Sequence, residues 1–312
     1  MTHPIRFRSI SGLKIGTGLY RGCLLAAVCC GRVFAQGQPP VQEQEPPQEI
    51  TVTAERQTEL ENEALIFSET PDAGPRTTHA YGVLGLVASF APVYDGSKKT
   101  KVGPFPYVDY RGLFDDRVFV SITNGIGLKV LNDEPVKAGV TVNYSGGRTS
   151  SDDPHLKGLP DIKGAAQVGG FITYSLKPFA FEAQVGRRLG SKPGTTVQLD
   201  GSVSAAPLPQ FHVSLSADLT WADSGYQKTF FGVTAAEAAQ ATSKGNPLTA
   251  YTPGSGLTMA SLTAAAVYQL NEDWGLIARI SLQDLAGTPA KNSPLTQRTF
   301  QTVFAFGAIY NL

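Results

Sequence analysis

The sequence predicts an all-β fold, a transmembrane antiparallel up-and-down β-barrel of about twelve strands, which follows a disordered N-terminal tether in the periplasm. The first observation is the stretch 211–223, in which apolar and polar residues alternate with the period of two that is typical of a β-strand. Its apolar face ends in Phe211 and Trp221. Roughly ten tilted residues cross the hydrocarbon core of a bilayer, with aromatic side chains at its two edges.

The second observation is a mean hydropathy of -0.07 without any apolar run long enough for a spanning helix. In lipid only helices and closed barrels satisfy every backbone hydrogen bond. The third observation is that long and short connections alternate between the expected strands. A half-buried strand of a soluble sandwich is the alternative for any one segment, so the prediction depends on the whole chain.

The first 35 residues are predicted to be a secretory signal peptide. Basic residues precede the short apolar core 23–31, and Val33 and Ala35 supply the small residues before a cleavage site at Gln36. All three cysteines lie inside this segment, so the mature chain is expected to contain no disulfide and no thiolate metal site. Removing its five basic residues leaves 21 basic against 26 acidic side chains, a net charge of −5. A mildly acidic chain offers no basic patch for nucleic acid.

Residues 36–78 are rich in Pro, Gln and Glu and are predicted to be a disordered periplasmic tether. One β-rich segment interrupts them, residues 49–56 with the sequence EITVTAER. It resembles the TonB box of TonB-dependent receptors, an extended peptide that adds a strand to an energising partner protein. Because the motif is short and β-rich, a plain spacer is the favoured interpretation, and contact with TonB is the alternative.

Residues 79–312 are predicted to form the outer-membrane barrel. The expected strands are 81–89, 104–111, 117–123, 125–131, 137–144, 165–176, 179–188, 195–206, 210–221, 256–270, 274–283 and 301–312. Several of them oppose an apolar face to a face that carries Asp, Glu or Arg, which is typical of a lipid-facing and a lumenal side. The last strand places Phe304, Phe306 and Tyr310 on one face, as barrel-terminating strands do, although it ends in Leu312 rather than Phe.

The connections predict the orientation of the barrel. With the first strand starting in the periplasm, the long connections 91–103, 145–164, 222–255 and 286–300 are extracellular, and the short ones are periplasmic turns. Only the connection 123–125 departs, because it is short and nominally extracellular. Within the connection 222–255, the run 235–243 is expected to be a short helix that packs over the mouth of the barrel.

Three short motifs, in order and spacing, carry a resemblance to a known family. They are residues 92–97 (PVYDGS), residues 230–234 (FFGVT) with the following Ala-rich run, and residues 292–295 (NSPL). In these the chain resembles the MipA/OmpV family of outer-membrane proteins, the MltA-interacting protein family, over about residues 81–312. Phe230 and Asn292 stand where the family usually has Tyr and Asp.

The resemblance implies an outer-membrane barrel. One family member is regarded as a scaffold that holds a murein-cleaving lytic transglycosylase near a murein-synthesising enzyme, and other members are linked to adhesion or to uptake of small compounds. Because one fold hosts many functions, the resemblance alone does not select among these roles.

One polar cluster invites a catalytic interpretation. Asp152, Asp153 and His155 follow Ser150 in one predicted extracellular loop, with Asp161 nearby, and carboxylates with a histidine can activate water by general base chemistry. The alternative is a solvated loop, since Ser, Asp and Pro are common loop residues. No metal-ligand spacing, phosphate-binding loop or nucleophile elbow occurs in the sequence. We therefore predict no catalytic, cofactor-binding or metal-binding residues, and no cofactor.

Three functions follow from these patterns. The first is a non-enzymatic barrel that contacts outer-membrane lipid and acts as a scaffold for periplasmic murein enzymes such as a lytic transglycosylase. The second is a barrel for small solutes, assisted by TonB at residues 49–56, with a lumen lined by the polar residues Glu182, Gln184, His212, Asp218 and Arg279. The third is a hydrolase at the extracellular rim. Inward side chains fill much of a narrow barrel, which favours the scaffold over an open pore.

Overall fold

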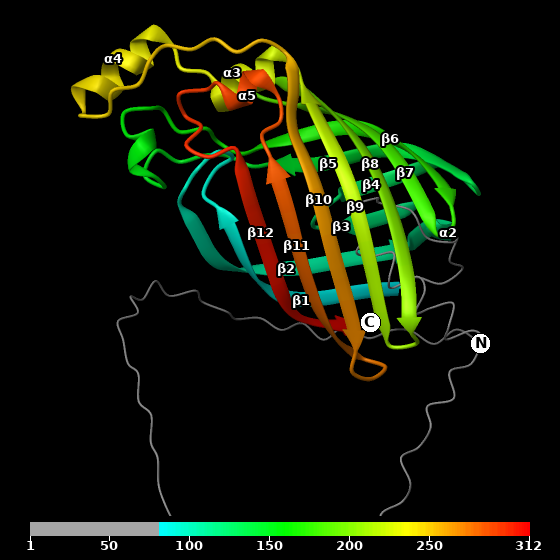
Figure 1. The fold of residues 1–312 in the computed structure, drawn as a ribbon. Helices are drawn as coiled ribbons and strands as arrows, with labels where there is room; N and C mark the ends of the chain where they lie inside the picture. The colour runs from blue at the N-terminus through cyan, green and yellow to red at the C-terminus, as the bar shows by residue number, and fades with distance from the viewer. Residues whose placement is uncertain (1–80) are drawn as a thin grey trace, which may run out of the picture. The chain divides into compact units, whose positions relative to one another are not determined.

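The computed structural model describes residues 81–312, and the predictions made for residues 1–35, 36–78 and 49–56 lie outside this part of the chain. Its strands close into one barrel in which neighbours in sequence pair and β1 pairs with β12 (Figure 1). The strands are β1 (Tyr81–Pro92), β2 (Thr100–Gly112), β3 (Val118–Ser121), β4 (Gly125–Asp133), β5 (Val136–Ser145), β6 (Ala165–Leu176), β7 (Phe179–Arg188), β8 (Gly194–Leu208), β9 (Phe211–Ala222), β10 (Gly256–Gln269), β11 (Trp274–Asp284) and β12 (Phe300–Asn311). The predicted antiparallel up-and-down barrel of twelve strands is therefore confirmed.

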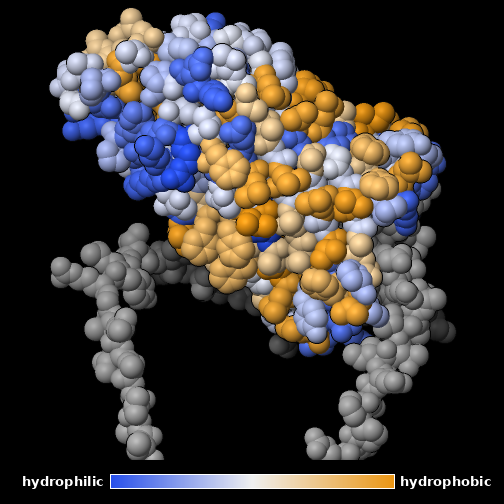
Figure 2. Space-filling view, in the orientation of Figure 1, coloured by the Kyte–Doolittle hydropathy of each residue, from blue (hydrophilic) through white to orange (hydrophobic). Residues whose placement is uncertain are grey.

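The alternation of residue types decides which side of each strand faces outward. On β9, Leu215, Leu219 and Trp221 are 45%, 47% and 40% exposed, whereas Ser214 and Ser216 are buried. The same apolar exterior is visible over the barrel wall, while the end that carries the long connections is largely hydrophilic (Figure 2). An apolar exterior around a polar interior is the arrangement that a barrel needs in lipid.

The helices all lie in connections between strands. They are α2 (Leu113–Asp116), the 3₁₀ helix η1 (Pro154–Leu156), α3 (Ser224–Phe231), α4 (Ala235–Ser243) and α5 (Thr288–Lys291). The predicted helix at 235–243 coincides with α4, which begins with a capping box between Thr234 and Glu237. Within residues 81–312, no helix is long and apolar enough to cross a membrane.

The predicted asymmetry of the connections is also confirmed, except at 91–103, where the prediction of a long connection is wrong: β1 continues to Pro92 and β2 begins at Thr100, which leaves only 93–99 between them. The long connections 146–164, 223–255 and 285–299 gather at one end of the barrel, opposite the end at which the short turns and the C-terminus lie (Figure 1). Long loops are extracellular in bacterial barrels, so the short turns face the periplasm.

The periplasmic half of the barrel interior is filled. A buried apolar cluster occupies it, with Val83, Val267 and Ile309 near the periplasmic ends of their strands. Two buried ion pairs add to it: Arg111 Nε lies 2.8 Å from Asp109 Oδ1, and Lys129 Nζ lies 2.9 Å from Asp116 Oδ2. No continuous open channel is therefore expected at this end of the lumen.

The β3–β4 hairpin is shorter than its neighbours. β2 pairs with β3 only at Asp109–Ser121 and Tyr110–Val120, and β3 pairs with β4 over four residues. The prediction that a strand covers 117–123 is wrong at its C-terminal end, because Ile122 and Thr123 belong to the turn into β4. The short connection at 123–125 is therefore the tip of a hairpin that does not reach the extracellular rim of the barrel.

Candidate functional site

The long extracellular connections pack into a single cap over the barrel mouth. Its core is a set of buried side chains from the connections 93–99, 146–164, 223–255 and 285–299, here called the cap cluster: Tyr94, Leu156, Leu159, Val233, Ala241, Leu248 and Leu295. Gly158 has a φ of 94°, and a Cβ there would lie 2.5 Å from Ala241 Cα. Glycine at this position therefore lets the connection 146–164 approach α4 closely.

Hydrogen bonds join the same four connections. Tyr94 Oη donates to Leu295 O at 3.0 Å, Ser97 Oγ donates to Asp153 Oδ2 at 2.7 Å, and Arg148 Nη1 donates to Phe230 O at 2.8 Å. Burial raises the pKa of Tyr94 to about 12, so this hydroxyl remains a donor at physiological pH. Tyr94, Ser97, Phe230 and Leu295 belong to the motifs that carry the family resemblance, so these motifs help to hold the cap together.

The cluster of Ser150, Asp152, Asp153, His155 and Asp161 serves the loop backbone. Asp153 Oδ1 accepts from His155 N at 2.9 Å, Asp152 Oδ2 accepts from Thr149 N at 3.1 Å, and Asp161 Oδ1 accepts from Ser150 N at 2.7 Å. His155 Nε2 lies 2.9 Å from Pro294 O. These contacts fit a loop whose polar side chains bind its own backbone better than a general base, although the loop is less solvated than the alternative assumed, since Asp153 is buried.

The electrostatics of Asp153 point the same way. Burial alone would raise the pKa of this carboxyl, but hydrogen bonds from the His155 backbone N–H, Ser97 and Gln297 outweigh it and hold the pKa below its usual value. A general base at neutral pH needs a pKa near the working pH, so Asp153 is suited to accept hydrogen bonds and not to take up a proton.

A cavity of about 550 Å³ lies inside the barrel below the cap. Four of the five predicted lumenal residues line it, namely Glu182, Gln184, Asp218 and Arg279. The fifth, His212, does not line it, because it is buried near the periplasmic end of β9 with 1% of its surface exposed. Within residues 81–312, no group of three or more His, Cys, Asp or Glu side chains is placed to hold a metal ion.

Three carboxylates stand side by side on the cavity wall. Glu182, Asp200 and Asp218 are directly opposite one another across β7, β8 and β9. Adjacent strands lie about 4.8 Å apart, so the three side chains form a short row. The alternation in the predicted strand 195–206 places Asp200 on the lumenal face, but only the pairing register brings it between the other two carboxylates.

Apolar side chains line other parts of the cavity wall, beside the polar Ser261, Arg279 and Gln283. They are Phe105 and Tyr107 of β2, Met259 of β10, Ile277 of β11 and Val303 of β12. The cavity thus offers both carboxylates and apolar surface, an arrangement suited to a small amphipathic molecule.

A second feature lies at the periplasmic end, in the turn formed by α2. Three consecutive residues other than glycine, Phe114, Asp115 and Asp116, have φ values of 52°, 58° and 60°. This left-handed conformation costs about 1–3 kcal/mol for each residue, and such strain gathers at functional sites. Phe114 is 77% exposed, so the turn presents an aromatic ring to the periplasm.

Buried contacts hold this turn in place. The Asp116 carboxylate pairs with Lys129 Nζ, and Asn132 Nδ2 donates to Asp116 O at 3.2 Å. The predicted strands 104–111 and 117–123 leave a short periplasmic turn here, but its left-handed conformation was not predicted, because the pattern LFDDR carries no glycine to indicate positive φ.

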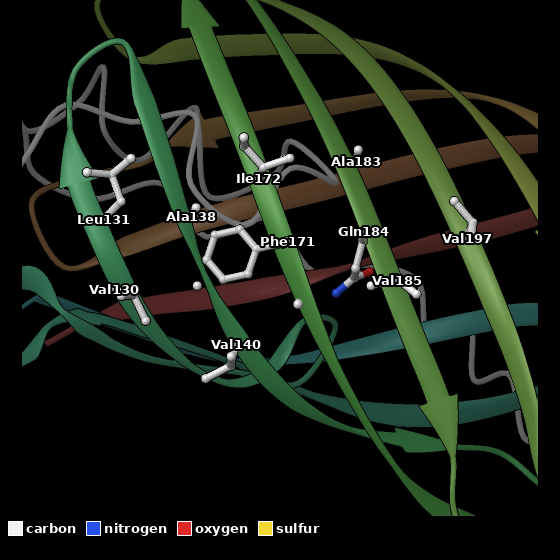
Figure 3. A pocket seen from close by; sticks show the side chains of 12 residues that line it. Val130, Leu131, Ala138, Val140, Phe171, Ile172, Ala183, Gln184, Val185 and Val197 are labelled. Atoms are coloured by element: carbon white, nitrogen blue, oxygen red, sulfur yellow. The ribbon is translucent and has the colours of Figure 1, made fainter.

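An apolar groove of about 530 Å³ lies on the outside of the wall, across β4 to β8 (Figure 3). Val140, Ile172 and Val185 are 51%, 50% and 48% exposed there, and Gly139 and Gly170 supply no side chain. The groove follows from small residues in an otherwise bulky apolar face, and this face belongs to the lipid-contacting exterior.

A family model described as "MltA-interacting protein MipA" matches residues 84–312. No curated protein sequence is significantly similar to the chain.

Solved structures of membrane barrels also align with the chain. The NanC porin is 8% identical with a TM-score of 0.39, and the alignment covers 73% of this chain and 100% of that one. OmpT of Vibrio cholerae is 9% identical with a TM-score of 0.33 over 75% and 97% of the two chains. The CymD monoaromatic hydrocarbon channel is 11% identical with a TM-score of 0.34 over 80% and 92%. These scores are too low to support an argument about ligands.

Proposed function

The chain belongs to the family of the MltA-interacting protein MipA, and from this premise we propose that it is a non-enzymatic scaffold whose periplasmic face docks a murein-remodelling enzyme. The barrel lies in the bacterial outer membrane, with its apolar exterior in the lipid. The partner proposed is a lytic transglycosylase, the class of enzyme that the resemblance implies for the family.

The strained α2 turn is the observation that carries this proposal. Phe114 exposes most of its ring on the periplasmic face, and burying aromatic rings supplies much of the binding energy at protein interfaces. The buried Lys129–Asp116 pair and the β-strands on either side fix the turn. A preformed, rigid turn loses little conformational entropy on binding, which favours affinity.

The interior of the barrel supports a scaffold over an open pore. Buried apolar residues and ion pairs fill the periplasmic half of the lumen, and the cap covers the extracellular mouth. Passage of small solutes remains the second candidate, and the cavity below the cap is the observation that favours it. Conductance in planar bilayers separates the two, since a scaffold with a filled lumen gives no single-channel current.

The test of docking is an affinity measurement between the whole purified barrel and a periplasmic lytic transglycosylase of the same bacterium. Phe114→Ala is expected to weaken binding at least about tenfold, because interface hot spots contribute about 2 kcal/mol or more. Leu270→Ala is the matched control, since Leu270 is 55% exposed in another periplasmic turn. If wild type binds and Phe114→Ala binds equally well, the turn is not the docking site; if wild type does not bind, the scaffold proposal is wrong.

A further inference from the structure

The barrel wall is interrupted in its extracellular half, between β2 and β5. β2 pairs with β1 along its whole length, but its other edge reaches β3 only at Asp109 and Tyr110, with one further hydrogen bond from Ile122 N to Val108 O at 2.9 Å. The β3–β4 hairpin ends at residues 122–124, whereas β5 continues to Ser145. In the described part of the chain, no strand pairs with β2 on this side from Thr100 to Pro106.

Two prolines show that the sequence encodes this interruption. Pro104 and Pro106 lie on β2 on either side of Phe105, and proline has no backbone N–H to donate. The bond from Ile122 N to Val108 O shows that the even-numbered residues of β2 direct their backbone groups toward β3. Both missing donors therefore lie on the unpaired edge, which is where proline is tolerated in a sheet.

The interruption opens into the lumenal cavity. Residues from each of its borders line that cavity: Phe105 from β2, Asn124 from the hairpin tip, and Asn143 and Tyr144 from β5. Above it, contacts between two extracellular connections form a roof, with Ser97 Oγ donating to Asp153 and Lys99 Nζ donating to Asp152 O. The opening therefore leads sideways, below the cap.

The outside of the opening is apolar and aromatic. Val102, Ile122 and Tyr144 are 58%, 40% and 77% exposed at its borders. Val102 is paired with Phe90, whose ring centroid lies 6.1 Å from that of Phe304 on the lipid-facing side. Because aromatic residues mark the edges of the apolar band, the opening faces the outer leaflet of the membrane.

We propose that this interruption is a lateral portal through which a small amphipathic amine moves between the outer leaflet and the lumenal cavity. Inside, the apolar part of the molecule contacts the wall formed by Phe105, Tyr107 and Met259, and the ammonium group reaches the carboxylates of Glu182, Asp200 and Asp218. This proposal does not depend on the proposed docking of a murein enzyme, because the portal lies in the extracellular half of the barrel and the α2 turn lies at the periplasmic end.

The charge of the ligand follows from Asp200. Both of its carboxyl oxygens are shielded from solvent and have no hydrogen-bond partner within residues 81–312, and Asp218 opposes it on the next strand. Buried carboxyl groups need a donor or a cation, and an ammonium group supplies both. The cavity volume of about 550 Å³ lies within the range of small-molecule sites, about 300–1,000 Å³.

The test uses the whole barrel in lipid nanodiscs and dansylcadaverine, a fluorescent amphipathic amine, with its N-acetylated neutral form as the control ligand. Saturable binding of the amine with a blue-shifted emission is expected, at least about tenfold tighter than that of the neutral form, since charged hydrogen bonds are worth about 1.5–3 kcal/mol. Asp200→Asn is expected to raise the Kd of the amine alone. Equal binding of both ligands, or no saturable binding, would overturn the proposed ligand class.

Stopped-flow rates test the route. Asn124→Trp places a bulky ring at the hairpin tip and is expected to slow association and dissociation together by about tenfold, with a much smaller change in Kd. Tyr144→Ala removes an exposed ring at the opposite border and is expected to speed both steps. Leu199→Trp, on the lipid face of β8, is the control for an added ring and should change neither rate. A gel-mobility shift on heating confirms that each variant is folded, and unchanged rates in both portal variants would show that the route is not lateral.

Discussion

Replacing Lys129 by methionine tests whether a buried charge holds the periplasmic turn. Lys129 Nζ lies 2.9 Å from Asp116 Oδ2, and the two side chains are 1% and 4% exposed. Methionine keeps most of the length and apolar volume of lysine, so the main change is an unpaired carboxylate in the barrel interior. Breaking a buried pair in this way typically costs about 3–5 kcal/mol, and we expect a loss of that size in the free energy of unfolding.

The double variant Lys129→Met with Asp116→Asn is the matched control. It removes both charges, and asparagine tolerates the left-handed conformation that Asp116 adopts at φ 60°. Neutral replacements of a buried pair are often tolerated, so the double variant should regain most of the stability lost in the single one.

Urea unfolding of the barrel in detergent, followed by the fluorescence of Trp221 and Trp274, gives the free energy of unfolding of the wild type, the single variant and the double variant. A cost below about 1 kcal/mol for Lys129→Met, the value of an exposed pair, would refute the reasoning that this pair fixes the turn. The same variant should also weaken enzyme docking, because Phe114 and Asp116 belong to one turn.

Three further predictions concern the cap and the wall. The pKa of Asp153 is lower in the folded cap than in the unfolded chain, so its contribution to cap stability is present above the unfolded pKa of about 3.9 and is lost as pH falls through the lower folded value. Hydrogen exchange of residues 146–164 should therefore speed up in acid. Asp153→Asn should abolish this acid-induced change. Leu156→Ala should cost about 2–5 kcal/mol locally, because this fully buried side chain is central to the cap cluster, and limited proteolysis should then cut the cap while the barrel stays folded. Leu215→Arg should lower the free energy of unfolding in lipid bilayers by about 2–4 kcal/mol, whereas Leu208→Arg near the end of β8 should lower it by about 0–1 kcal/mol. Equal losses in the two variants would contradict the membrane placement.

The wall of the barrel could be predicted from the sequence because its signal is local. A period of two in β9, bounded by Phe211 and Trp221, predicts the strand and separates its apolar face from its polar face, and the repetition of the pattern in other strands identifies the apolar face as the lipid-facing one. The same holds for β6 and β7, whose predicted bounds coincide with the observed ones.

The cap and the row of three carboxylates on the cavity wall could not be predicted in this way, because they depend on residues far apart in the chain. Tyr94 and Leu295, which share a hydrogen bond, are separated by 201 positions. Asp200 joins Glu182 and Asp218 only through the register of β7, β8 and β9. Nothing in a single strand reports such contacts.

The portal is a different case, because its signal was present in the sequence. Pro104 and Pro106 fall within the predicted strand 104–111. Two prolines in alternate positions indicate a strand edge without a pairing partner, since neither can donate to a neighbouring strand. The strained turn at Phe114 gave no comparable signal, because its residues do not differ from those of an ordinary turn.

Site-specific photocrosslinking in living cells tests the central claim most directly. A photoreactive amino acid is placed at position 114, in the α2 turn, and at position 270 as the control on the same periplasmic face. The scaffold proposal predicts a covalent adduct with a murein lytic transglycosylase from position 114 and none from position 270. Formation of the adduct only from position 270, or from neither position while the enzyme is present in the periplasm, would contradict it.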